Sequence, residues 1–192
     1  YLKDIESSLY YVDMSSCDYQ LGGSALFQAN NKIGNRCNDI NSAKKFKNIF
    51  NVIQNIIKDG DIHSGHDISS GGMITCLLEM CFVSDGIGLN IDLSSLEESD
   101  IVKVLFSENH GIIFQAEEKI EDRLSNSNIK FHKIGSLSKS SNLTVIKSDF
   151  NINLDIDEYR KKWFKKSYLF DKLQSGNRKA KERFDNLTSN KL

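Results

Sequence analysis

Residues 65–82 read GHDISSGGMITCLLEMCF, and this stretch decides how the rest of the chain is interpreted. Its first eight residues contain three glycines, and its last ten are apolar except for Thr75 and Glu79. Glycine adopts positive φ and lets the backbone approach another group closely, so the first part predicts a loop. A helical segment that is apolar on nearly every side predicts burial, so a buried helix is expected at about Met73–Val83.

The loop has the side chains and the position to bind a phosphate group together with a metal ion. A helix N-terminus presents unpaired N–H groups and a partial positive charge, and both favour phosphate binding. Gly71 and Gly72 permit close approach of a ligand, while Ser69 and Ser70 offer hydroxyl groups. Asp67 offers one carboxylate, and protein-bound Mg²⁺ usually takes one or two carboxylates with phosphate oxygens and water. The loop is therefore a candidate site for a phosphorylated ligand such as a nucleotide together with magnesium, with Ser69, Ser70, Gly71 and Gly72 at the phosphate and Asp67 at the metal.

A purely structural interpretation of the loop stays open. Asp67 or Ser69 caps the buried helix in that case, and the two glycines only make room for it. His66 is either a general acid or base, or a side chain that packs on the loop and holds Asp67 in place. A lone His beside a loop carboxylate more often has the second role, so His66 is a candidate supporting residue. The GxxxxGK[ST] pattern of a P-loop is absent from the sequence.

A second glycine turn, LGGSALFQ at residues 21–28, allows the same two interpretations. It either holds a phosphate or forms an ordinary tight turn in which Ser24 caps a short helix. A strong amphipathic helix is expected from Ser42 to Gly60, because its apolar residues recur at steps of three and four.

The order of the remaining elements predicts an α+β fold, a mixed β-sheet layered with α-helices. Strands are expected at YYVDM (10–14), near Ile62, at IGLNIDL (87–93), IIFQA (112–116), KFHKIG (130–135) and LTVIKS (143–148). Further helices are expected from Ser99 or Asp100 through Phe106, near Glu118 to Ser125, and from Asp157 to Leu173. We divide the chain into a lead-in with a glycine turn (1–41), a main domain (42–156), and a basic helix and linker (157–192). Tyr159, Trp163 and Phe164 are expected to contact the core, and the polar residues beyond Leu173 are expected to form the linker.

Charge is distributed unevenly along the 192 residues, whose net charge is only −1. From Asp157 to the end, eleven Lys or Arg residues stand against five Asp or Glu. Such an end marks either a nucleic-acid or membrane tail, or a basic helix docked on an acidic body. The sequence has no apolar run of 18 residues, so no membrane span is expected. The four cysteines (Cys17, Cys37, Cys76, Cys81) show no CxxC spacing, which favours a reducing compartment over metal binding.

Four segments occur in the order and at the spacing typical of phosphoribosylformylglycinamidine synthases. They are LGGSALFQ (21–28), HDISSGGM…LLEMCF (66–82), GLNIDL (88–93) and LFSENHGIIFQ (105–115). From about residue 8 to residue 184 the chain resembles this family of the aminoimidazole ribonucleotide synthetase superfamily. The resemblance implies the fold of the C-terminal domain of aminoimidazole ribonucleotide synthetases.

The resemblance also implies an activity for the larger enzyme. Family members convert formylglycinamide ribonucleotide, ATP and glutamine to formylglycinamidine ribonucleotide, ADP, phosphate and glutamate, with Mg²⁺ and ATP/ADP as cofactors. The chain would be the C-terminal synthetase-type domain of the large, single-chain, cytoplasmic form, cut before its glutaminase domain. Its partners would be the preceding synthetase domains and the glutaminase domain of the same chain, with no nucleic acid and no membrane.

The family pattern assigns Asp67 as a magnesium ligand and Ser69 as a nucleotide contact. It places the other metal carboxylates in a preceding domain, so no catalytic residue is expected in this chain and the isolated chain is expected to be inactive. The domain is expected to serve a structural rather than a catalytic nucleotide site. The sequence departs from the pattern at Ser70, where the family often has Asp, and at Asn109 and His110, where it often has Glu and an apolar residue.

Two other functions remain open from the sequence. The chain is alternatively a non-catalytic interaction module that binds a phosphorylated or acidic partner through the glycine-rich loop and the basic C-terminal helix. Nucleic-acid binding ranks last, because the basic tail lacks interleaved aromatic residues and a recognised motif.

Overall fold

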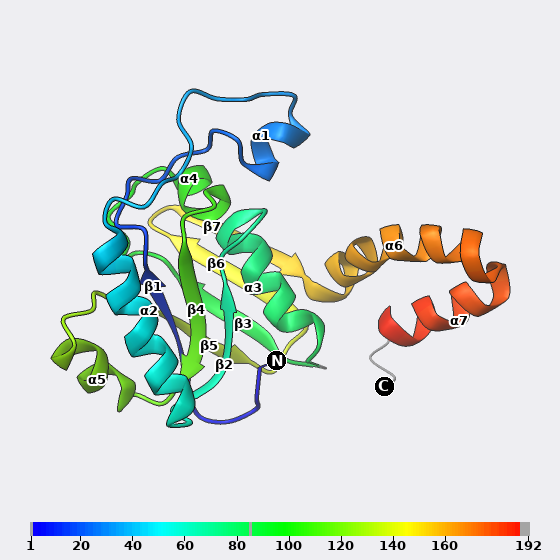
Figure 1. The fold of residues 1–192 in the computed structure, drawn as a ribbon. Coiled ribbons are helices and arrows are strands. Elements are labelled where there is room, and N and C mark those ends of the chain that lie inside the picture. The colour runs from blue at the N-terminus through cyan, green and yellow to red at the C-terminus, as the bar shows by residue number, and fades with distance from the viewer. Residues whose placement is uncertain (1, 85, 189–192) are drawn as a thin grey trace.

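A seven-stranded mixed sheet forms the centre of the protein (Figure 1). The structure is a computed structural model and describes residues 2–84 and 86–188. The strands are β1 (Ser8–Asp13), β2 (Ile62–Asp67), β3 (Gly88–Asp92), β4 (Gly111–Ala116), β5 (His132–Ser138), β6 (Asn142–Lys147) and β7 (Phe150–Asp155). The helices are α1 (Ala25–Ala29), α2 (Ala43–Lys58), α3 (Gly72–Phe82), α4 (Ile101–Phe106), α5 (Ile120–Asn126), α6 (Ile156–Ser175) and α7 (Asn177–Thr188).

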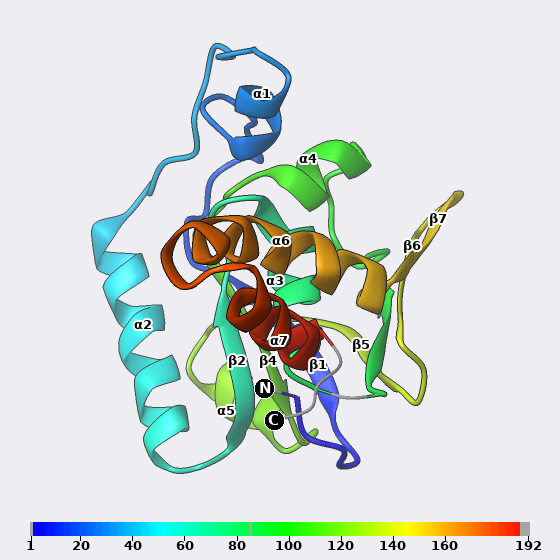
Figure 2. The same ribbon diagram turned by 90° about the vertical axis from the view of Figure 1, so that its right-hand side faces the viewer.

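The strand order is β2-β4-β1-β5-β3-β6-β7, with β2 at one edge and β7 at the other (Figure 2). Only β3 and β6 pair in parallel, and the other neighbours are antiparallel. The predicted mixed sheet with helices is therefore confirmed.

Strand β1 lies in the middle of the sheet and is covered on both faces. Its residues Leu9, Tyr10, Tyr11 and Val12 are at most 1% exposed. An uninterrupted apolar strand is typical of a sheet with helices on both sides. Residues 8–13, which belong to the predicted lead-in segment, are thus part of the central sheet.

Helices cover both faces of the sheet (Figure 1). On one face, α2 buries Ile49, Ile53 and Ile56 together with α5. On the other face lie α3 and α4, and α3 is buried over nine of its eleven residues. The two predicted serine caps are confirmed, because the hydroxyl oxygens of Ser24 and Ser42 accept hydrogen bonds at the starts of α1 and α2. Among the described helices, none combines the length and the apolar character needed to cross a bilayer.

Two elements correct the sequence analysis. Strand β7, FNINLD, was not expected, because asparagines occupy its outward positions and dilute the strand signal. The predicted linker beyond Leu173 is instead helix α7, which turns back on α6 after Gly176. The α6–α7 hairpin is held by the rings of Tyr168 and Phe184, 4.7 Å apart, and by the Arg183–Asp171 ion pair at 2.6 Å.

Helix α6 joins the core through a residue that sequence analysis missed. Tyr159 packs on the main core as expected, and the Trp163 ring lies 5.9 Å from that of the core residue Phe82, although Trp163 remains 49% exposed. Arg160, by contrast, is only 3% exposed. Its Nε donates to the Phe82 carbonyl at 2.9 Å, and its Nη2 donates to the Ser84 carbonyl at 3.4 Å. Arg160 therefore satisfies carbonyl groups left without a helical partner at the end of α3.

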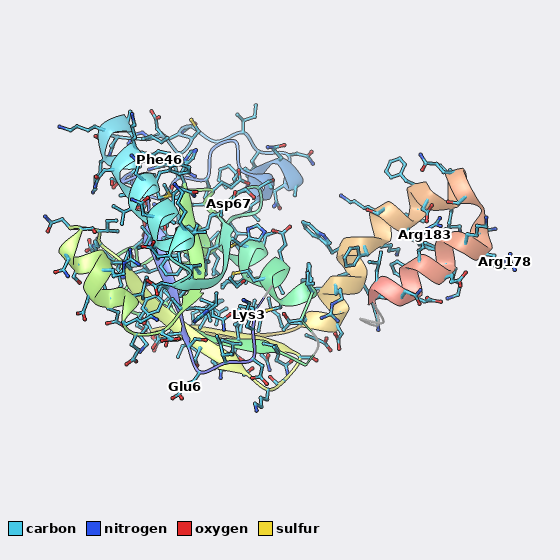
Figure 3. The ribbon with its side chains drawn as sticks, turned by 60° about the horizontal axis from the view of Figure 1, so that its bottom comes forward. Lys3, Glu6, Phe46, Asp67, Arg178 and Arg183 are labelled. Carbon is cyan, nitrogen blue, oxygen red and sulfur yellow. The ribbon has the colours of Figure 1, made fainter. Side chains whose placement is uncertain are left out.

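Replacement of Arg160 by Ala should lower the free energy of unfolding by about 2–3 kcal/mol, because buried carbonyls lose a charged donor. Thermal or denaturant unfolding of the chain measures this change. The matched control is Arg178→Ala, since Arg178 is exposed at the turn of the hairpin (Figure 3) and should change stability by less than about 0.5 kcal/mol. Equal effects of the two substitutions would show that Arg160 does not support α3.

Candidate functional site

The glycine-rich loop connects the end of edge strand β2 to the start of α3. The Ile68 N–H donates to the Gly111 carbonyl at 2.8 Å, which fixes the chain where it leaves the sheet. Ser69 and Ser70 are exposed, and then the chain turns into α3 through Gly71 (φ +91°) and Gly72 (φ +75°). The buried helix is thus confirmed. The loop is shorter than predicted, because Gly65, His66 and Asp67 belong to strand β2 and only residues 68–71 connect it to α3.

Gly72 is required by the close packing of α3 on α4. A Cβ atom there would lie 2.6 Å from the Leu105 carbonyl oxygen, which no real Cβ contact permits. A Cβ at Gly71 would lie 2.3 Å from the hydroxyl oxygen of Thr75. Both positions also have positive φ, which L side chains avoid. The two glycines therefore let α3 begin against the backbone of its neighbour.

Glu108 caps α3, although neither the capping nor the site interpretation of the sequence included it. Its Oε1 accepts a hydrogen bond from the Gly71 N–H at 2.9 Å and another from the Ala25 N–H at 2.8 Å. One carboxylate oxygen thus connects the starts of α3 and α1. The negative charge also suits the partial positive charge of a helix N-terminus.

This geometry corrects the structural interpretation of the loop. The residue before α3 is Gly71, and its N–H donates to Glu108 rather than to Asp67 or Ser69, so the expected capping by Asp67 or Ser69 is wrong. The Gly71 N–H is used by Glu108, and the Gly72 N–H donates to the Ser69 carbonyl at 3.0 Å. In the described part of the chain, the N–H groups and hydroxyls of Ser69 and Ser70 have no protein partner, so they are the donors open to an anion.

Asp67 presents its carboxylate at the end of β2 with 80% of the side chain exposed. His66 lies beside it, with Nδ1 2.7 Å from the Asp67 backbone oxygen and 3.7 Å from Oδ1. The Nε2 of His66 is 3.3 Å from Glu79 on α3. Partial burial raises the pKa of the Glu79 carboxyl, an effect that His66 opposes and Asp67 reinforces. His66 thus contacts the Asp67 backbone and Glu79, whereas its ring lies too far from the Asp67 carboxylate for a hydrogen bond.

The loop offers part of a metal site rather than a complete one. In residues 2–84 and 86–188, no three His, Cys, Asp or Glu residues gather closely enough to hold a metal ion. Asp67 provides one hard oxygen, which fits Mg²⁺ only if phosphate, water or another domain completes the coordination.

An apolar groove of ≈ 620 Å³ adjoins Asp67. Helix α2 and strand β2 form its walls, and Figure 3 shows Phe46 of α2 and Asp67 on neighbouring elements. Its principal apolar lining residues are Met14, Phe46, Phe50, Ile53, Ile57, Ile62, Ile68 and Ile112. The groove and the loop together place apolar walls beside an exposed carboxylate.

The other residues singled out in the sequence lie near the loop or in the core. His110 is exposed and packs edge-on against Phe46, with ring centroids 6.3 Å apart. Asn109 is 1% exposed, and its Nδ2 donates to the Cys17 carbonyl at 3.4 Å. Burial raises the pKa of both core thiols, that of Cys81 to about 12, so Cys76 and Cys81 stay protonated at neutral pH and behave as small apolar residues.

Comparison with known proteins decides the family. The family described as "AIR synthase related protein, C-terminal domain" matches residues 14–148, which include the whole loop and α3. The chain belongs to this family. The resemblance stated from the four sequence segments is thereby confirmed.

Curated relatives carry the name that the sequence segments indicated. The chain is 29% identical to phosphoribosylformylglycinamidine synthase of Homo sapiens over 87% of its own length and 13% of the relative's. It is 33% identical to a probable chloroplastic or mitochondrial phosphoribosylformylglycinamidine synthase of Arabidopsis thaliana over 86% of its own length and 12% of the relative's. The chain therefore spans only about one eighth of these relatives.

Solved structures share the fold. Thermotoga maritima PurL complexed with FGAR superposes with a TM-score of 0.63 at 11% identity, over 79% of this chain and 27% of that one. The hydrogenase maturation protein HypE gives a TM-score of 0.51 at 15% identity, over 77% of this chain and 52% of that one. These likenesses confirm the AIR synthase-like arrangement of a mixed sheet with helices.

The connection made by Glu108 can be measured directly. In Glu108→Ala, the Gly71 and Ala25 amides should exchange with deuterium roughly ten to a hundred times faster, because each loses a charge-assisted hydrogen bond. Glu108→Gln keeps an acceptor oxygen and should retain most of the protection. Glu6→Ala, at an exposed position, is the control that should leave both rates unchanged. Unchanged rates in Glu108→Ala would show that the carboxylate does not join the two helix starts.

Proposed function

We propose that this chain is the C-terminal synthetase-type domain of a large phosphoribosylformylglycinamidine synthase, an ATP-dependent carbon–nitrogen ligase of purine biosynthesis. The whole enzyme would convert formylglycinamide ribonucleotide, ATP and glutamine to formylglycinamidine ribonucleotide, ADP, phosphate and glutamate. The observation that carries this proposal is the exposed Asp67 carboxylate beside the start of buried α3, in a chain 29–33% identical to such synthases.

The domain would supply one side of a magnesium–nucleotide site. Asp67 would hold Mg²⁺, which would neutralise charge on the phosphates, and His66 would hold the end of β2 in place through its contacts with the Asp67 backbone oxygen and Glu79. Ser69 would donate to the phosphates, and Gly71 and Gly72 would leave the space for them. Because Glu108 occupies the Gly71 N–H, we expect phosphate oxygens to contact the free donors of Ser69 and Ser70.

The remaining groups of the site would come from the rest of the longer chain. Phosphoryl transfer depends mainly on positioning and on charge stabilisation around the phosphates. A single protein carboxylate on an open loop supplies too little of either, so the isolated domain would be inactive. The preceding synthetase domains would add the other metal ligands, and a glutaminase domain of the same cytoplasmic polypeptide would deliver ammonia from glutamine.

The apolar groove beside Asp67 is suited to the base of the nucleotide. Its walls from α2 include the Phe46 and Phe50 rings, and aromatic or aliphatic walls with a few polar groups are typical of ligand sites. A nucleotide bound only by this groove and the glycine-rich loop would join this domain to another one. We therefore favour a structural nucleotide site over a catalytic one.

Two-dimensional amide NMR of the isolated chain, titrated with Mg–ADP, tests the proposal because it detects weak binding and locates it. We expect a dissociation constant of roughly 1 mM, about −4 kcal/mol, with shifts centred on residues 67–72. Asp67→Asn should abolish the magnesium-dependent shifts. The matched control is Glu6→Gln, which removes one negative charge far from the loop (Figure 3) and should bind as the wild type does.

Three results would contradict the proposal. Shifts that persist in Asp67→Asn would exclude Asp67 as the metal ligand. The absence of shifts at residues 67–72 would exclude the loop as a nucleotide site. Micromolar binding lost in Asp67→Asn would show a self-sufficient site instead of one side of a shared one.

A further inference from the structure

A second, larger groove opens on the other face of the sheet, between α3, α4, β7 and α6. Its volume is ≈ 950 Å³, and it shares no lining residue with the groove beside Asp67. Helices α3 and α4 form one wall, β7 forms the floor, and α6 forms the other wall. The two grooves are therefore separate surfaces of the protein.

The groove exposes the margin of the main hydrophobic core. Phe150, Ile152 and Leu154 of β7 point to the helix-covered side of the sheet and pack on the core, yet they stay only partly buried. Val102 on α4 is 42% exposed, and Trp163 on α6 is 49% exposed. Helices cover the central strands on this face, but edge strand β7 lacks such a cover in the described chain. A continuous apolar surface of this kind marks a site of interaction.

The charged side chains that line the groove are all basic. Lys162 lies with Nζ 4.8 Å above the Tyr159 ring and pairs with Glu158 at 2.6 Å. Lys166, one helical turn later, lines the groove and has no ion-pair partner within the described residues. No Asp or Glu of the described chain is among the lining residues. A partner with apolar residues in the groove and carboxylates along this wall would complement it.

We propose that this groove binds an acidic amphipathic helix, which lays leucine-like side chains over β7 and places carboxylates beside Lys162 and Lys166. Such a helix would extend the layer formed by α3 and α4 to the edge of the sheet. Apolar grooves between helices are the usual receptors for a helix anchored by residues at i, i+3, i+4 and i+7. The chain covers only 12–14% of its curated relatives, so a polypeptide of that length has ample sequence outside this domain to supply the helix.

Trp163 makes the proposal directly measurable, because it is the only tryptophan of the chain and lies in the groove wall. The probes are two synthetic helical peptides without Trp, with the same leucine pattern and either Glu or Lys at the other positions. The Glu peptide should shift Trp163 emission to the blue and protect it from acrylamide, with saturation. The Lys peptide should bind roughly ten times more weakly, because two charge pairs become repulsive.

Exposed variants separate groove binding from a general charge effect. Lys166→Glu should remove the preference for the Glu peptide, whereas Lys165→Glu, on the same helix but outside the groove, should keep it. Val102→Glu should weaken both peptides without unfolding the chain, since Val102 is already 42% exposed.

Three results would overturn the proposal. The first is no saturable change of Trp163 emission with the Glu peptide. The second is an equal loss of preference in Lys165→Glu and Lys166→Glu, which would mean attraction by overall charge. The third is a concentration-dependent dimer of the chain alone that shields Trp163, which would make a second copy the occupant.

Discussion

Helix α3 packs so tightly against α4, its neighbour on the same face of the sheet, that its first residue has no room for a side chain. The start of the helix at Gly72 touches the backbone of α4, and Glu108 holds the preceding amide. At the other end, Arg160 of α6 pairs with the last carbonyls. The same buried helix therefore fixes the glycine-rich loop at one end and the α6 wall of the apolar groove at the other.

This arrangement explains how an exposed loop can have a defined geometry. Asp67 and Ser69 lie on the surface, where few contacts would otherwise restrict them. Their neighbours in the chain are held by hydrogen bonds, because the Ile68 N–H donates to a carbonyl of β4 and the Gly71 N–H donates to Glu108. Binding residues on a loop between rigid elements are a common way for proteins to place functional groups. The family assignment then gives the chemistry that such a loop would serve.

The elements that could be predicted from the sequence are those determined by residues close to one another in the chain. The apolar run of α3, the spacing of α2 and the glycines of the loop were each readable from neighbouring residues, and the structure confirms them. Asp67 and His66 were found because they adjoin the glycines. Their ligand roles remain proposals, since they depend on groups outside the chain.

Long-range contacts were the part that the sequence did not reveal. Glu108 acts on amides 37 and 83 residues away, and no local pattern indicates such a partner. Arg160 was only counted among the basic residues of the C-terminal segment, although it is buried and donates to the carbonyls at the end of α3. Trp163 contacts the core residue Phe82 as expected, but the sequence did not indicate that the position of α6 leaves half of its surface exposed at the margin of a groove.

The seating of α3 is tested most directly by comparing Gly72→Ala with Gly60→Ala in thermal unfolding. Both glycines have positive φ (+75° and +80°), but a Cβ at Gly60 meets no atom within 4 Å. Gly60→Ala should therefore lower the free energy of unfolding only by the backbone strain, about 1–2 kcal/mol. Gly72→Ala should cost about 1–3 kcal/mol more, because α3 must move away from α4. Equal losses of stability in the two variants would contradict the account, since they would mean that α3 is not held against the backbone of α4.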